Sequence, residues 1–211
     1  MIRSVLVILG LAGSAWAGPT LSFTLDTDHF GGAGAAPFGR IDVSDLGGGT
    51  VNVLVNLNNG LLFVATGFPG TFGFNLGGNP TIAVSNVSTG WSLVSGAADA
   101  LKFDGFGDFE YAMRCDDCDT GASSPVPPPL SFDVTATGLT PNSFAETSTG
   151  GTPSAYMAVD VVGAKGKTGA VGAVGPPVVP PVPEPSSIAL LGTTAGAFLF
   201  MLWSRKRRMT S

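Results

Sequence analysis

Apolar and polar residues alternate along several short segments of this chain. The alternation covers residues 21–25, 51–57, 72–76, 109–113, 130–136 and 157–161. Because side chains two apart on a β-strand point to the same face, each segment predicts a strand with one side against a core. Turn-forming residues separate the segments. Asn59-Gly60, between 51–57 and 61–66, predicts a β-hairpin because both residues tolerate positive φ.

The strand pattern also predicts the fold class. Between the two ends of the chain, the only helix expected is a short one over residues 141–145, with Thr140 as N-cap and Pro141 at the first position. About ten short strands with frequent turns are typical of two antiparallel sheets packed on one another. We therefore expect an all-β protein, an antiparallel β-sandwich of jelly-roll-like type.

The first 17 residues have the features of a signal peptide. Arg3 supplies a positive start, residues 5–12 are apolar, and Ala15-Trp16-Ala17 places small residues at the positions that signal peptidase requires. A first transmembrane helix is the alternative, but the apolar stretch is too short to span a bilayer. We expect cleavage after Ala17 and export of the residues that follow.

The last two dozen residues predict a membrane anchor. Ile188 to Trp203 is an apolar run without a charge, which as a helix would span about 24 Å. Arg205, Lys206, Arg207 and Arg208 follow it and would stay on the cytoplasmic side. The alternative is a buried core helix, which gains little from such a cluster. We expect a single C-terminal transmembrane helix, with residues 18–185 (the body) outside the inner membrane.

The order of these features resembles a known sorting signal. Pro183-Glu184-Pro185, an apolar helix and a terminal basic cluster, in residues 183–208, are similar to the PEP-CTERM signal of Gram-negative bacteria that make exopolysaccharide. The resemblance implies recognition by an exosortase, a membrane-embedded processing enzyme. It also implies a final location at the cell surface or outside the cell, in a biofilm or exopolysaccharide matrix. The resemblance does not extend to the body.

Charge and composition describe the body further. It holds fifteen acidic residues but only five basic ones (Arg40, Lys102, Arg114, Lys165 and Lys167), a net charge of about −10. Nucleic acid is therefore not expected as a partner, since phosphate binding needs clustered cations. We assign residues 18–162 to the sandwich and the Gly/Pro-rich residues 163–182 to a linker, with an edge strand over 165–175 as the alternative. The proline-rich 176–185 predicts an extended stalk of about 30 Å.

The two cysteines stand three positions apart. Cys115 and Cys118 are the only cysteines of the chain, and outside the cytoplasm a disulfide is the expected state. Zinc would need further ligands of the same kind, and a thioredoxin-like role would need a βαβ context that the sequence lacks. We expect a structural disulfide that closes a small loop.

Acidic residues and one histidine supply the remaining candidate chemistry. Asp104, Asp108 and Glu110 form the best candidate calcium site, because Gly105 and Gly107 allow backbone carbonyls to turn inward. Solvated loop charge is the alternative for these and for the other acidic clusters. His29 lies beside Asp26 and Asp28, but no nucleophile motif accompanies it. We therefore expect no enzyme activity and no catalytic residue.

Three classes of function remain open on this evidence. The first is a structural surface or matrix protein associated with exopolysaccharide. The second is a carbohydrate-binding module, in which Trp91, Tyr111 and Tyr156 would form a sugar-stacking platform. The third, a secreted hydrolase, is disfavoured by the missing nucleophile and base motifs.

Overall fold

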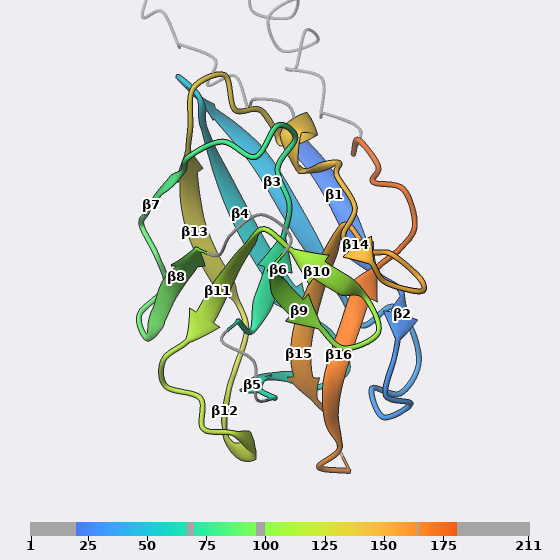
Figure 1. The fold of residues 1–211 in the computed structure, drawn as a ribbon. Coiled ribbons are helices and arrows are strands. Elements are labelled where there is room, and N and C mark those ends of the chain that lie inside the picture. Colours follow the sequence, from blue (N-terminus) through green and yellow to red (C-terminus); the bar gives the residue numbers. More distant parts are fainter. Residues whose placement is uncertain (1–19, 67–69, 96–99, 164, 181–211) are drawn as a thin grey trace, which may run out of the picture. The chain divides into compact units, whose positions relative to one another are not determined.

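A computed structural model describes residues 20–66, 70–95, 100–163 and 165–180 (Figure 1). The predicted signal peptide with Ala15 and Ala17 lies outside the described residues. So do the Pro183-Glu184-Pro185 motif, the apolar run and the basic cluster from Arg205 to Arg208. Among the residues that are described, no helix has the length and apolarity needed to cross a membrane.

The described residues form sixteen strands and one short 3-10 helix, which confirms the all-β class. The strands are β1 (Thr20–Leu25), β2 (Thr27–Asp28), β3 (Gly39–Gly47), β4 (Thr50–Leu57), β5 (Leu62–Ala65), β6 (Phe72–Phe74), β7 (Ala83–Ser85), β8 (Trp91–Ser95), β9 (Leu101–Phe103), β10 (Gly107–Phe109), β11 (Tyr111–Cys115), β12 (Gly121–Val126), β13 (Leu130–Thr135), β14 (Thr149–Gly150), β15 (Met157–Val162) and β16 (Thr168–Ala173).

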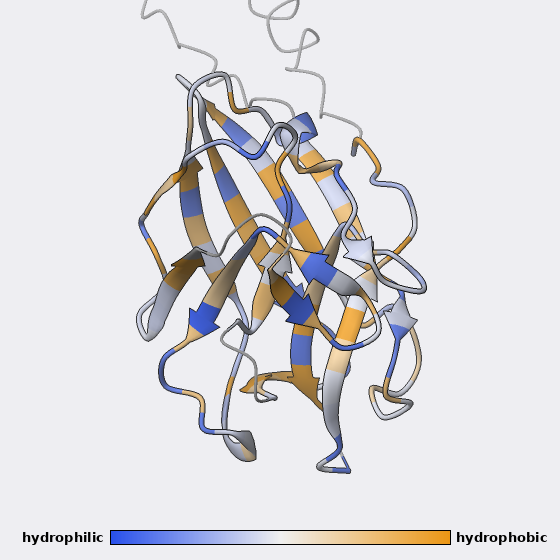
Figure 2. Cartoon of the chain, in the orientation of Figure 1, coloured by the Kyte–Doolittle hydropathy of each residue, from blue (hydrophilic) through white to orange (hydrophobic). Residues whose placement is uncertain are grey.

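The first sheet has the order β1-β3-β4-β13-β7, and all its pairings are antiparallel. Its strands follow the predicted two-residue period. On β4, Val51, Val53 and Val55 are buried, whereas Asn52 and Asn56 on the other face are half-buried. Figure 2 shows the same alternation of apolar and polar bands along β3, β4 and β13. One face of this sheet is therefore polar.

The second sheet is organised around β15. On one side β15 pairs with β16, and β16 pairs in turn with β2. On its other side β15 pairs with β6 near its start and with β5 near its end. β11 and β8 continue the sheet beyond β6, and β12 continues it beyond β5. Met157, Val159 and Val161 point from β15 into the main core, whereas Ala158 belongs to a separate cluster on the opposite face.

The two sheets pack face to face, as in a β-sandwich. One continuous cluster of buried residues contains the inward side chains of both sheets. At its centre, the ring centroid of Phe132, from the first sheet, lies 6.0 Å from that of Phe72 and 5.9 Å from that of Phe74, both from the second. Burial of these large aromatic surfaces is the main stabilising contribution of such a core.

A small third sheet, β14-β10-β9, has its own core against the second sheet. Phe103, Phe106 and Phe109 pack there against small residues of the outer face of the second sheet, namely Ala112, Ala158 and Ala170. Glycines complete this surface. A Cβ added at Gly73 would lie 2.5 Å from the Phe103 ring, so the aromatic layer requires that position to carry no side chain.

Two details of the predicted strand pattern are wrong. Residues 109–113 do not form one strand facing one core, because the chain changes sheet at Glu110. Phe109 ends β10 and packs in the outer cluster, whereas Tyr111 begins β11 and faces the main core. Asn59 and Gly60 have the expected positive φ values of 57° and 71°. Their turn, however, leads from β4 in the first sheet to β5 in the second, so no hairpin forms.

The predicted short helix is confirmed, as a 3-10 helix over Pro141–Phe144 with Thr140 as N-cap. The boundary of the sandwich at residue 162 is too early. β16 falls inside the predicted linker and pairs with β15 along its whole length, which confirms the alternative of a last strand. Val178 then exchanges two backbone hydrogen bonds with Ser22 of β1, at 2.8 and 2.9 Å. The folded body therefore includes the start of the predicted stalk.

Candidate functional site

The three carboxylates of the predicted calcium site do not converge. Glu110 is only 7% exposed, and its Oε2 accepts a hydrogen bond from the Leu76 backbone N–H at 3.2 Å. Asp104 is exposed in the turn after β9, and Asp108 lies on β10. Among the described residues, no three His, Cys, Asp or Glu side chains are grouped so that they could hold a metal ion. The calcium prediction is therefore not supported by the geometry.

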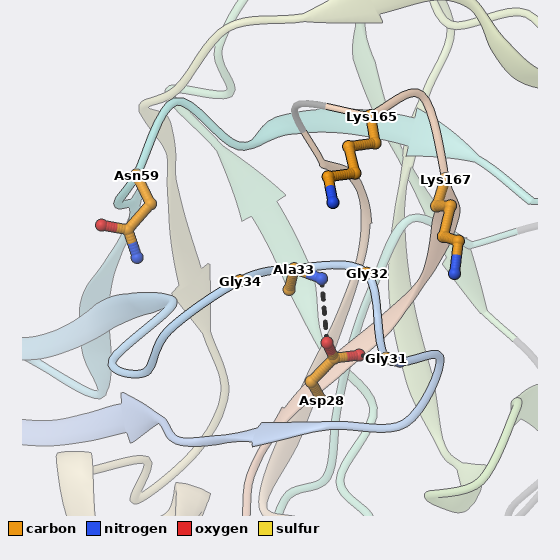
Figure 3. Close-up of a pocket in the computed structure, with 8 residues that line it drawn as sticks. All are labelled: Asp28, Gly31, Gly32, Ala33, Gly34, Asn59, Lys165 and Lys167. Atoms are coloured by element: carbon orange, nitrogen blue, oxygen red, sulfur yellow. Dashed lines mark hydrogen bonds between the residues drawn. The ribbon is translucent and has the colours of Figure 1, made fainter.

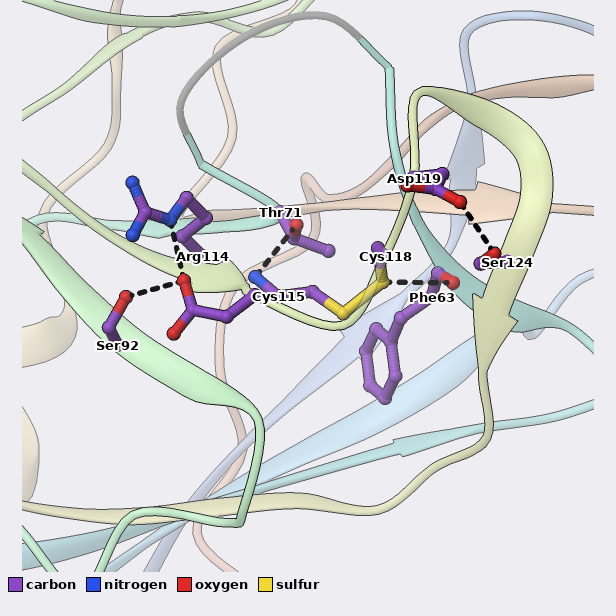
Figure 4. Close-up of a disulfide and its surroundings, with 9 residues drawn as sticks. Phe63, Thr71, Ser92, Arg114, Cys115, Cys118, Asp119 and Ser124 are labelled. Carbon is purple, nitrogen blue, oxygen red and sulfur yellow. Dashed lines mark hydrogen bonds and ion pairs between the residues drawn. A yellow bond between two sulfur atoms is a disulfide. The ribbon is translucent and has the colours of Figure 1, made fainter.

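The Cys115–Cys118 disulfide joins the end of β11 to the loop that leads to β12 (Figure 4). The Cys115 backbone N–H donates to Thr71 Oγ1 at 3.2 Å, and Cys118 Sγ lies 3.6 Å from the Phe63 carbonyl oxygen. Cys115 is buried. The bond thus ties a loop to the side of the main core, a structural role that leaves little of the sulfur accessible to a reactant.

A polar surface cluster lies next to the disulfide. Asp116 Oδ1 accepts hydrogen bonds from Arg114 Nε at 2.7 Å and from Ser92 Oγ at 2.9 Å (Figure 4). The Arg114 hydrogen bond, together with that from Ser92 and the guanidinium charge, lowers the pKa of Asp116 below its ordinary value of 3.8. The cluster is solvent-exposed, so it contributes little to stability.

The aromatic residues expected on a sugar-stacking platform are not on the surface together. Trp91 is 8% exposed and packs edge-on against Phe63, with ring centroids 5.0 Å apart. Tyr111 is 5% exposed, and its hydroxyl donates to the Pro80 carbonyl oxygen at 2.5 Å. Burial, followed by the nearby Glu110 and Glu146 charges, raises the pKa of Tyr111 to about 12. Tyr156 is only partly buried, and its ring packs against that of Phe23, with centroids 5.7 Å apart. The platform is therefore absent.

His29 and Asp26 have structural positions near β16. The His29 ring lies against Phe106, with centroids 6.0 Å apart, and its backbone N–H donates to the Ala170 carbonyl. Asp26 accepts backbone hydrogen bonds from Val174 and Gly175, each at 3.1 Å. Within the described residues neither contacts a serine side chain that could act as a nucleophile. These contacts attach the end of β16 to the first strands.

A cavity of about 420 Å³ opens between three separate segments of the body (Figure 3). Its lining residues come from the loop after β2, from the turn at Asn59 and from the turn between β15 and β16; they are Asp28, Gly31, Gly32, Ala33, Gly34, Asn59, Lys165 and Lys167. This volume falls in the range of small-molecule sites in proteins. The cavity is thus a candidate binding site in the described part of the chain.

Asp28 shapes the glycine-rich side of this cavity. Its Oδ1 accepts the backbone N–H groups of Phe30 and Gly31 at 2.9 Å each, and its Oδ2 accepts that of Ala33 at 2.8 Å. Gly31 and Gly34 have φ values of 65° and 95°, which glycine adopts without strain. The carboxylate is therefore engaged in fixing the loop.

The two lysines bring positive charge to the opposite side. Lys165 and Lys167 lie in the β15–β16 turn, are exposed, and extend toward the loop of residues 28–34 (Figure 3). The ion pairs found among the described residues are Arg40–Asp42 and Arg114–Asp116, so neither lysine is paired with a carboxylate there. Asn59 Nδ2 donates to the Ala35 carbonyl at 2.8 Å, and its amide oxygen points away from the two lysines (Figure 3).

Sequence reasoning did not find this site. Both lysines fell in the predicted linker, and no role was predicted for the glycines after Asp28. The one available signal was a pair of lysines, two positions apart, at the start of the alternative edge strand 165–175. This signal does not indicate which distant loop the lysines approach. Comparisons with protein families, with curated proteins and with solved structures found no match to this chain.

Proposed function

We propose that this chain is an exported, exosortase-processed protein of the cell surface or extracellular matrix, with a structural role in exopolysaccharide or biofilm. The observation that carries the proposal is the order of Pro183-Glu184-Pro185, an uncharged apolar run and four basic residues at the end of the chain. The single transmembrane helix, the jelly-roll-like connectivity and inner-membrane anchoring before processing belong to the same proposal.

Two features of the body support export. Its two cysteines form a disulfide, the state that persists in oxidising compartments and is rare in the cytosol. Its surface charge also suits an extracellular protein that does not bind nucleic acid, since acidic residues outnumber basic ones three to one in residues 18–185.

Cell fractionation tests the proposal. Deletion of residues 183–211 should move the protein from the membrane fraction to the soluble exported fraction, because the apolar run is lost. Replacing Arg205, Lys206, Arg207 and Arg208 with serine should impair retention in the membrane. The matched control replaces Arg205, Arg207 and Arg208 with lysine, which keeps the charge and should keep retention. An unchanged membrane pool after the deletion would refute the anchor.

A carbohydrate-binding role is the second candidate, and one observation favours it. The aromatic platform is absent, but the cavity between residues 28–34, Asn59 and the β15–β16 turn presents two lysines that no carboxylate of the described residues pairs with. Such a role would be compatible with a place in the matrix, because a matrix protein that binds the polymer is held within it.

A further inference from the structure

We propose that the cavity lined by Asp28, Asn59, Lys165 and Lys167 binds a single carboxylate-bearing sugar unit, a hexuronic acid, within a sparsely charged polysaccharide. The proposal deepens the function proposed above and rests on it for its biological setting. The chemistry of the cavity is argued from the described residues alone.

The cavity attracts an anion because its cations are not neutralised. Lys165 and Lys167 supply two positive charges, and Asp28 supplies the only carboxylate among the lining residues. That carboxylate already accepts three backbone N–H groups, so its lone pairs are occupied on the side of the loop. An ammonium–carboxylate contact is the interaction that two flexible lysines form most readily.

The remaining lining favours a sugar over a bare anion. The volume of about 420 Å³ is much larger than a small inorganic ion needs and is suited to a ring with several hydroxyls. A Cβ built at Gly31 or at Gly34 would meet nothing within 4 Å, so the loop leaves open space beside its backbone.

The charge of the rest of the body selects against densely charged polymers. Residues 18–185 carry about ten more carboxylates than cations. At physiological salt, charges more than about 8 Å apart are largely screened from one another. The carboxylate of a sugar bound in the cavity is therefore affected mainly by the two lysines. A polymer with a charge on every unit would also lie against the acidic surface outside it, which costs free energy.

The cavity is built from loops and turns of the sandwich. Figure 1 shows the β15–β16 turn at the opposite end of the sandwich from residues 176–180, where the described chain ends. Loops at one end of a sandwich are a common place for binding sites, since the sheets hold them rigidly. The β15–β16 turn of the cavity thus lies at the end of the sandwich opposite residues 176–180.

The test is a titration of the full-length, isotope-labelled chain in detergent with methyl glucuronoside, followed by backbone amide NMR shifts. The amides of Gly31, Gly32 and Gly34 should shift with a dissociation constant in the millimolar range or below. The neutral methyl glucoside and inorganic phosphate should produce much smaller shifts. The Lys165→Gln/Lys167→Gln variant should bind about tenfold more weakly, whereas Lys102→Gln, which removes an exposed lysine outside the cavity, should bind as the unsubstituted chain does.

Each outcome decides the proposal. Equal binding of phosphate and glucuronoside would overturn the sugar assignment, and the absence of shifts at the three glycines would overturn the site. Equal weakening by Lys102→Gln would show a general charge effect and would also overturn it. If the amide shifts of residues outside the cavity are the same in the double variant and in the unsubstituted chain, the double variant is folded. Because the titration uses purified protein, its result is independent of where fractionation places the chain in the cell.

Discussion

The buried carboxyl of Asp160 should make the stability of the body fall as pH rises. Asp160 lies on β15, is 3% exposed, and accepts a hydrogen bond from the Thr66 hydroxyl. Burial raises its pKa from 3.8 to about 7; hydrogen bonds from Thr66 oppose the rise, and the charge of Asp104 adds to it. The folded protein therefore holds this proton at a pH at which the unfolded chain has already lost it.

The sign and size of the effect follow from linkage. Because the pKa is higher in the folded state, the stabilising contribution is complete below about pH 4 and is lost as pH rises through 7. A difference of about three pKa units corresponds to roughly 4 kcal/mol. Since domains of this kind unfold with about 5–15 kcal/mol, the loss is a large fraction of the total.

The substitution Asp160→Asn tests this reasoning. Asparagine stays neutral, and its amide oxygen can still accept from Thr66, but its NH₂ group brings donors that need partners. We expect the variant to be less stable than the unsubstituted protein by about 1 kcal/mol at pH 5 and more stable by about 2 kcal/mol at pH 9, because about two of the three pKa units of the shift lie between these pH values. The two stability curves should cross between these values.

Urea denaturation at several pH values between 5 and 9 measures the effect. Both proteins carry His29→Gln, so that the one histidine of the chain does not contribute to the slope. Asp133→Asn is the matched control, because Asp133 is a buried strand carboxylate that accepts hydrogen bonds from Asn52 and Asn86 at 2.7 and 2.6 Å. Parallel pH profiles for the Asp160→Asn variant and its parent would refute the argument.

Two further predictions concern packing and the disulfide. Gly73→Ala should destabilise the body by about 1–3 kcal/mol in urea denaturation, because the new Cβ would lie 2.5 Å from the buried Phe103 ring. Gly77→Ala, whose Cβ would find its nearest atoms at 3.8 Å, should change stability by less than about 0.5 kcal/mol, and equal losses would contradict the packing argument. Replacing both Cys115 and Cys118 with serine should cost about 1–2 kcal/mol by the same assay, since the bond closes a loop between residues only three apart. A loss above about 4 kcal/mol would show that the loop itself holds the core.

The sequence predicted which side chains of a strand face the core, because that depends on the local two-residue period. It did not predict which strands pair with one another, because that depends on residues far apart in the chain. Alternation at 51–57 and 130–136 placed Val53 and Phe132 in the core correctly, because a strand's two faces are set by neighbours in the chain. The same rule failed at Phe109, where the chain changes sheet within one residue. Nothing local distinguishes a turn that closes a hairpin from one that joins two sheets, so Asn59-Gly60 was assigned wrongly.

The candidate site shows the same limit. The disulfide was predicted from the spacing of two cysteines in a chain expected to be exported, and the structure contains it. The calcium candidate failed because Glu110 lies where the chain passes into β11, so its carboxylate is turned toward the Leu76 backbone. The cavity could not be predicted, because Asp28 and Lys167 meet only through the pairing of β2 with β16.

The Ser22–Val178 pairing limits the reach of the tail. Pro183 lies only five positions after Val178, and a fully extended chain advances at most about 3.6 Å per residue. A processing enzyme that acts at Pro183 must therefore work within roughly 18 Å of a folded surface. An enzyme that cannot approach so closely would require the two backbone hydrogen bonds between Ser22 and Val178 to open first. The rate of cleavage would then depend on how often this pairing opens.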